Sequence, residues 1–210
     1  MVTCGPLAPL AVKSVCDAGQ VVFSDDYHAN GKRLFNARII PYRGSWVEFV
    51  IDVNDIMYVY IDRRRKIPVT VLLKAMGFEP NGAIIKLFHK TKVHTLSPKA
   101  NRKDTSLIGG IVAEDVVNRE TGEIIVESGR ALTETAMDLM KSQKNYKVVL
   151  IDKEGSLEED VITKTLEKDP TSGREDALKK IYNLMRPGDP PNAETARALL
   201  DRLFFNPKRY

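Results

Sequence analysis

The early part of the chain alternates between apolar and polar residues in short runs, a period-2 pattern typical of β-strands. Turn formers such as Asn30-Gly31 and Asn54-Asp55 separate these runs. The pattern predicts strands over residues 33–41, 46–52 and 57–65, preceded by a short apolar run at 21–23. In the last strand the parity directs Tyr58, Tyr60, Asp62 and Arg64 to one face. Arg63 and Arg65 then point inward, and we expect at least one of them to brace the domain.

Later segments show the period of an amphipathic helix. After Pro68, apolar residues recur at 69, 72, 73 and 76, and Gly77 is a suitable stop. The same reasoning predicts helices over residues 83–89, 133–141, 161–167, 177–185 and 193–204. Apolar runs at 108–117 and 123–127 predict a hairpin, and 146–151 a strand, whereas residues 90–104 are polar and without a period.

These elements predict an α+β fold: a mixed strand-and-helix domain interrupted by a small inserted α+β module. We expect an irregular leader over residues 1–20, the first part of the domain over 21–90, the inserted module over 91–160, and a helical second part over 161–210.

Composition narrows the function. The chain of 210 residues is 43% hydrophobic and has no stretch near the ~20 apolar residues of a membrane span. Cys4 and Cys16 lack metal-ligand spacing, so we expect no bound metal. Two cysteines in 210 residues suit a reducing environment, so we expect a cytoplasmic location. The three histidines are scattered, and no catalytic constellation emerges. We expect no cofactor in this chain.

Charge is distributed unevenly along the chain. The net charge is +6 in residues 1–100 and −2 in the remainder, and a run of four cations at 63–66 lies in the basic part. A basic surface beside a lone tryptophan, Trp46, suits a phosphate backbone and an unpaired base. A solvated surface with scattered charge remains the alternative.

Four stretches, in order, resemble the β subunit of bacterial RNA polymerase. They are residues 36–46 (NARIIPYRGSW), 61–68 (IDRRRKIP), 186–191 (RPGDPP) and 203–210 (LFFNPKRY), with a weaker match at 169–171. The resemblance implies the lobe, or β2, domain, which is one jaw of the cleft that holds downstream DNA. It places the inserted module where many bacterial β subunits carry a lineage-specific insertion.

The resemblance also implies roles for single residues. Trp46 stacks on an unpaired non-template base, and Asp62 accepts a hydrogen bond from a base amine. The residues alone leave two other readings open: a half-buried strand tryptophan that adds core area, and an ion pair between Asp62 and Arg63 or Arg65.

The basic residues are candidates for phosphate contacts. Arg64 and Lys66 are the stronger ones, and Arg38 and Arg43 are weaker candidates for the same surface. Arg186 precedes a stiff proline-rich connector that could direct it toward the transcription bubble, or it could cap the preceding helix.

The chain departs from the family in two places. The lobe is usually entered through an Arg-Ser-Pro-Gly-Val segment, but residues 15–23 read VCDAGQVVF, so an arginine that helps to hold a non-template guanine is missing. The family continues for many hundreds of residues past the counterpart of Tyr210, so we expect a fragment. The resemblance assigns the magnesium-binding aspartates to the β′ subunit.

The partners that the resemblance implies are DNA, the rest of β, the β′, α and ω subunits and a sigma factor. A second hypothesis comes from a different class: a stand-alone protein that copies the lobe to capture transcription factors. An open reading frame that continues past Tyr210 would favour the first hypothesis over the second.

Overall fold

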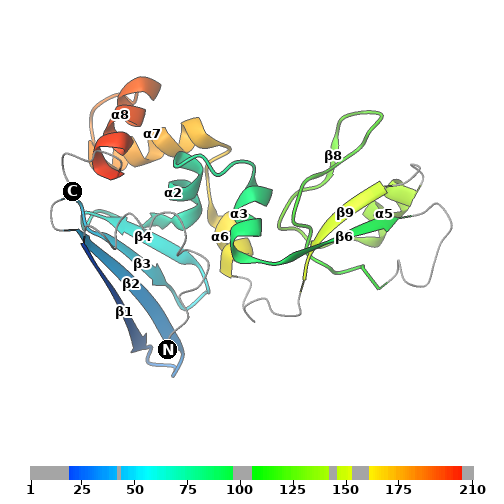
Figure 1. Ribbon diagram of the computed structural model, residues 1–210, viewed down its shortest axis with the longest axis horizontal. Helices are drawn as coiled ribbons and strands as arrows, with labels where there is room; N and C mark the ends of the chain where they lie inside the picture. The colour runs from blue at the N-terminus through cyan, green and yellow to red at the C-terminus, as the bar shows by residue number, and fades with distance from the viewer. Residues whose placement is uncertain (1–18, 42–43, 97–105, 142–145, 153–160, 205–210) are drawn as a thin grey trace. The chain divides into compact units, whose positions relative to one another are not determined.

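The computed structural model describes residues 19–41, 44–96, 106–141, 146–152 and 161–204 (Figure 1). Helices and strands both contribute, which confirms the predicted α+β class. The described residues form two compact units. The first unit comprises those up to Glu79 and from Val161 on, and the second comprises those from Pro80 to Asp152. The helix at residues 81–88 therefore belongs to the second unit, whereas the sequence analysis grouped residues 21–90.

An antiparallel five-stranded sheet forms the framework of the first unit. Its order follows the chain, from β1 to β5. The strands are β1 (Gly19–Tyr27), β2 (Arg33–Pro41), β3 (Val47–Ile51), β4 (Met57–Ile61) and β5 (Ile67–Pro68). Gly31 has φ +83° in the turn between β1 and β2, a backbone conformation that glycine adopts without steric cost.

Four helices cover one face of this sheet (Figure 1). They are α2 (Val69–Ala75), α6 (Val161–Lys168), α7 (Arg174–Met185) and α8 (Ala193–Phe204). Buried residues of β3 and β4, among them Val47, Val59 and Ile61, share one hydrophobic core with Ile181 of α7 and Leu200 of α8. The helical periods in the sequence predicted these faces, because the inward residues recur every third or fourth position.

A buried ion pair joins α2 to the segment after α6. The Lys74 Nζ lies 2.9 Å from the Asp169 carboxylate, and the two side chains are 5% and 0% exposed. Lys74 also donates to the Thr171 carbonyl at 2.7 Å, and the Thr171 backbone N–H donates to Asp169 at 2.8 Å. Mutual pairing satisfies groups that would be costly to bury alone. The ion pair therefore fastens two segments that are remote in sequence.

Asp55 anchors the turn between β3 and β4. It accepts hydrogen bonds from Lys32, in the β1–β2 turn, and from Lys164 of α6, the second at 2.9 Å. The hydrogen bond from Lys32, followed by that from Lys164, lowers the pKa of Asp55 from its ordinary value. Asp55 has φ +61°, a region in which aspartate and asparagine are better tolerated than most residues.

The second unit is built from short elements around its own core. They are α3 (Asn81–Phe88), β6 (Thr91–Leu96), β7 (Val116–Val117), β8 (Ile124–Val126), α5 (Glu134–Lys141) and β9 (Tyr146–Ile151). β6 pairs with β9, and β7 pairs with β8. Leu96, Val112, Leu132, Met140 and Leu150 lie in this core.

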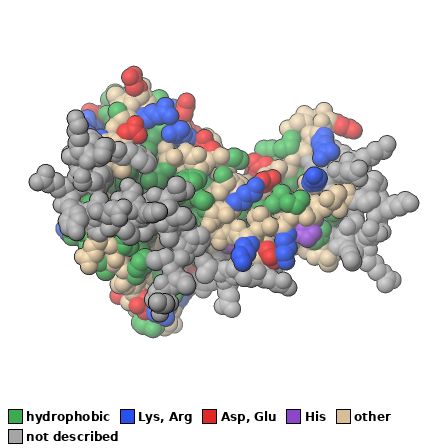
Figure 2. Space-filling view, viewed as in Figure 1, with side chains coloured by type: hydrophobic (Ala, Val, Ile, Leu, Met, Phe, Trp, Pro, Cys, Tyr) green, Lys and Arg blue, Asp and Glu red, His purple; other side chains and the backbone are tan. Residues whose placement is uncertain are grey.

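One expectation for the second unit is wrong. Residues 91–96 were expected to be irregular, but they form β6, whose partner β9 begins 50 residues later in the chain. The expected hairpin and helix are present, and the Thr133 hydroxyl accepts from the Ala136 N–H at 3.3 Å, as an N-cap does. On the visible surface of both units, charged and hydrophobic side chains are interspersed (Figure 2).

Candidate nucleic-acid interface

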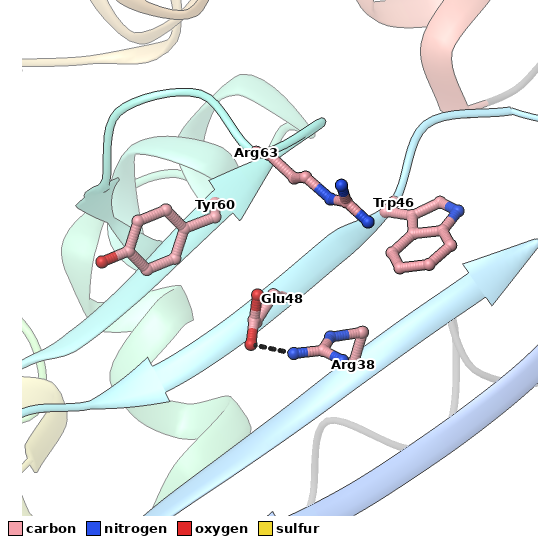
Figure 3. Close-up of a pocket in the computed structure, with 5 residues that line it drawn as sticks. All are labelled: Arg38, Trp46, Glu48, Tyr60 and Arg63. Carbon is pink, nitrogen blue, oxygen red and sulfur yellow. Dashed lines mark hydrogen bonds and ion pairs between the residues drawn. The ribbon is translucent and has the colours of Figure 1, made fainter.

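The face of the five-stranded sheet that the helices leave uncovered carries a small hollow, which we call the open-face hollow (Figure 3). Its volume is about 260 Å³. It is lined by Arg38, Trp46, Glu48, Tyr60 and Arg63. Strand register brings these residues together, because Arg38 of β2 pairs with Glu48 of β3, which pairs with Tyr60 of β4. The three therefore form one row across the sheet.

Trp46 immediately precedes β3 and forms one wall of the hollow. Its carbonyl accepts a hydrogen bond from the Asp62 N–H at 2.8 Å, which extends the β3–β4 pairing by one position. The side chain is half-buried. Its backbone is thus held beside the ends of two interior strands, while the side chain is only partly buried.

Arg63 lies over this indole. The guanidinium carbon is 4.9 Å from the ring centroid, a cation–π contact (Figure 3). Arg63 was expected to point into the domain, and this prediction is wrong. β4 ends at Ile61, and Asp62 and Arg63 adopt φ values of +53° and +56°. This left-handed turn breaks the strand parity, so the Arg63 side chain returns over the open face.

The remaining cations follow Arg63 in what we call the cationic loop, residues 62–66. All five of its residues are exposed. Arg65 is therefore not directed inward either, against the prediction from parity. Lys66 lies over the Tyr58 ring, with its Nζ 4.2 Å from the centroid. Arg64 and Lys66, the two stronger phosphate candidates, are thus both available at the surface.

Asp62 is exposed in this loop. Among the described residues no ion pair joins it to Arg63 or Arg65, so that alternative finds no support there. Its carboxylate is accessible to solvent, and its backbone N–H is used by Trp46.

A carboxylate lies in the open-face hollow as well. Oε1 of Glu48 lies 2.7 Å from a guanidinium nitrogen of Arg38, and the two side chains are 31% and 44% exposed. This pairing weakens Arg38 as a phosphate ligand. The amino groups of a base can donate to Glu48. The hollow, which Arg38 and Arg63 also line, therefore offers an acceptor to a base edge, and the cationic loop offers exposed cations to a phosphate.

One further candidate, Arg186, lies apart from this surface. Arg186 is exposed at the C-terminal end of α7, where its backbone N–H donates to the Tyr182 carbonyl at 2.8 Å. Its guanidinium lies 3.9 Å from the Asp189 carboxylate, and it does not line the open-face hollow. Arg43 falls outside the described residues.

Sequence reasoning missed three lining residues: Glu48, Tyr60 and Arg63. Strand parity carried a signal for two of them, because Glu48 shares a face with Trp46, and Tyr60 shares a face with Tyr58. Nothing in the local pattern indicated Arg63, since its position depends on the left-handed turn.

In the described part of the chain, no group of three or more His, Cys, Asp or Glu side chains could hold a metal ion. Nor is any helix in that part long and apolar enough to cross a membrane.

One family model defines the class of protein. Residues 18–108 match the family model for RNA polymerase Rpb2, domain 2. This match begins beside β1 and includes the open-face hollow, the cationic loop and the start of the second unit.

Comparison with whole proteins is more specific. The chain is 40% identical over 205 residues to the DNA-directed RNA polymerase subunit beta of Porphyromonas cangingivalis, and the match covers 90% of the chain and 16% of that protein. For Leptospira biflexa the identity is 40% over 179 residues, covering 84% and 14%. For Chlorobium chlorochromatii it is 39% over 194 residues, covering 90% and 15%. The chain belongs to the bacterial RNA polymerase β subunit family and corresponds to about one sixth of such a subunit.

Proposed function

We propose that the first unit is the lobe domain of an RNA polymerase β subunit, with the second unit inserted into it. In this role it lines the DNA cleft and contacts the unpaired non-template strand and downstream DNA during DNA-templated RNA synthesis. The observation that carries the proposal is the open-face hollow, where a half-buried indole adjoins an exposed cationic loop.

The chemistry is binding without bond-making. An unpaired base stacks on Trp46, a contact worth roughly 1–3 kcal/mol that any base can make. Asp62 accepts a hydrogen bond from a base amine. Arg64 and Lys66 neutralise phosphates and release the counterions condensed on them. The Glu48 carboxylate supports a base contact in the hollow, because it can accept a hydrogen bond from a base amine.

Catalysis belongs to the assembly. We propose that this chain acts in the cytoplasm together with DNA, the remainder of β, β′, α, ω and a sigma factor. It contributes no catalytic centre. The nucleotidyl-transfer chemistry and its magnesium ion are assigned to residues of the β′ subunit.

The proposal is tested with the polymerase that contains this segment. Trp46→Ala should shorten the lifetime of the open promoter complex by about 5-fold to about 140-fold, because a base loses its stacking partner. Trp46→Phe keeps an aromatic face and should recover much of that loss. An unchanged lifetime for Trp46→Ala would rule out the stacking role.

A further inference from the structure

We propose that Tyr60 provides a second stacking platform, so that the open face holds two successive unpaired bases. The inference rests on the function proposed above and extends it by one nucleotide. Tyr60 lies across the hollow from Trp46, and both side chains are half-buried (Figure 3). Each ring therefore keeps accessible surface on its own side of the same hollow.

Strand register sets the spacing of the two rings. Trp46 lies opposite Asp62, and Glu48 pairs with Tyr60, so Tyr60 is displaced by two residues along the sheet. The two residues also stand on adjacent strands, so they are diagonal neighbours, which lie roughly 7–8 Å apart and point to the same face. Aromatic side chains on the sheet of an RNA-recognition motif stack two or three bases in this way.

The charges around the rings orient the strand. Glu48 lies between them in the hollow, paired to Arg38, while the cations of residues 64–66 are exposed on the adjoining loop. Base edges can donate to the carboxylate, and the phosphates lie toward the loop. A strand with two bases in the hollow and its phosphates beside the cationic loop satisfies both the carboxylate and the cations.

The geometry also limits the platform to two bases. Tyr58 is the next aromatic residue on the same face, but it is paired with Pro68 of β5 and does not line the hollow.

Abasic scanning of the non-template strand tests the inference. Single abasic sites are placed in turn along the melted region, and open-complex lifetimes are measured with wild-type, Trp46→Ala and Tyr60→Ala polymerase. We expect one position whose abasic effect disappears in Trp46→Ala, and the adjacent position to behave likewise in Tyr60→Ala. Each wild-type effect should lie between about 5-fold and about 140-fold. Tyr60→Phe should behave as wild type, and so should Tyr58→Ala.

The outcomes separate the two proposals. If no position depends on Trp46, the function proposed above fails. If a position depends on Trp46 but none depends on Tyr60, only the second platform fails. A uniform loss of lifetime in Tyr60→Ala, equal at every abasic position, would show a structural role or a protein contact, and would also overturn the inference.

Discussion

The two units build their cores from the chain in different ways. The core of the second unit comes from one continuous stretch, between Leu96 and Leu150. The core of the first unit combines residues 47–75 with residues 177–203, on either side of that stretch. The first unit therefore depends on contacts between segments remote in sequence, and its described helices pack on one face of the sheet. The proposed binding face therefore belongs to the unit whose sheet packs against helices on its other face.

The largest expected effect falls on the link between the remote segments. Lys74→Ala leaves the fully buried Asp169 carboxylate without its cation, and should lower the free energy of unfolding of the first unit by about 3–5 kcal/mol. Hydrogen exchange of the purified chain should show the loss of protection mainly in β3, β4, α2 and α7. Lys180→Ala, an exposed change on α7, should cost less than about 0.5 kcal/mol. Equal stability of the two variants would contradict the role given to Lys74.

A core substitution in the second unit should shift the loss of hydrogen-exchange protection from the first unit to the second. Met140 is fully buried in the second unit, and Met140→Ala should cost about 2–5 kcal/mol through lost contacts and a cavity. Exchange should accelerate mainly in β6, β9 and α5. An equal acceleration in the five-stranded sheet would show that the two units do not unfold separately, and would contradict the independence of their two cores.

A smaller, pH-dependent effect is expected at Asp55. Its folded-state pKa is lowered by Lys32 and Lys164, so its contribution is present above the unfolded pKa and is lost as the pH falls through the folded one. Asp55→Asn should lower the free energy of unfolding by about 1 kcal/mol at pH 7. The difference should shrink as the pH drops below the ordinary value of 3.8. Urea unfolding at several pH values measures this, and a constant difference would contradict the pairing.

The smallest effect concerns binding alone. Arg64→Ala should lower the slope of log affinity against log salt by about 1, because one phosphate contact is lost, with the fold unaffected. Lys147→Ala, an exposed cation on β9 of the second unit, serves as the matched control and should leave the slope unchanged. DNA binding by the assembled polymerase at several salt concentrations gives both slopes. A slope unmoved by Arg64→Ala would remove this residue from the interface.

Much of this architecture follows from local pattern, and the exceptions share a physical cause. Alternation separated Val47 and Phe49 from Trp46 and Glu48 on the two faces of a strand, without showing which face is the core, and helical periodicity predicted the inward residues of α7 and α8. β6 escaped prediction because its pairing with β9 is non-local and its own sequence is polar. The position of Arg63 could not be predicted, because two successive residues in the left-handed conformation follow the strand. The dipeptide Asp-Arg does not indicate that conformation. The hollow therefore could be predicted only in part.

The central claim is that the open face, and not the opposite one, meets unpaired non-template DNA. Site-specific photocrosslinking tests it most directly, with a benzophenone amino acid at Tyr60 or, as control, at Phe23. Phe23 is 59% exposed and, by register with Ala37 and Phe49, lies on the opposite face of the same sheet. We predict that the Tyr60 probe labels the non-template strand in open complexes but not in duplex-bound closed ones, and that the Phe23 probe labels neither. Labelling from Phe23 alone, or equal labelling before and after melting, would contradict the account.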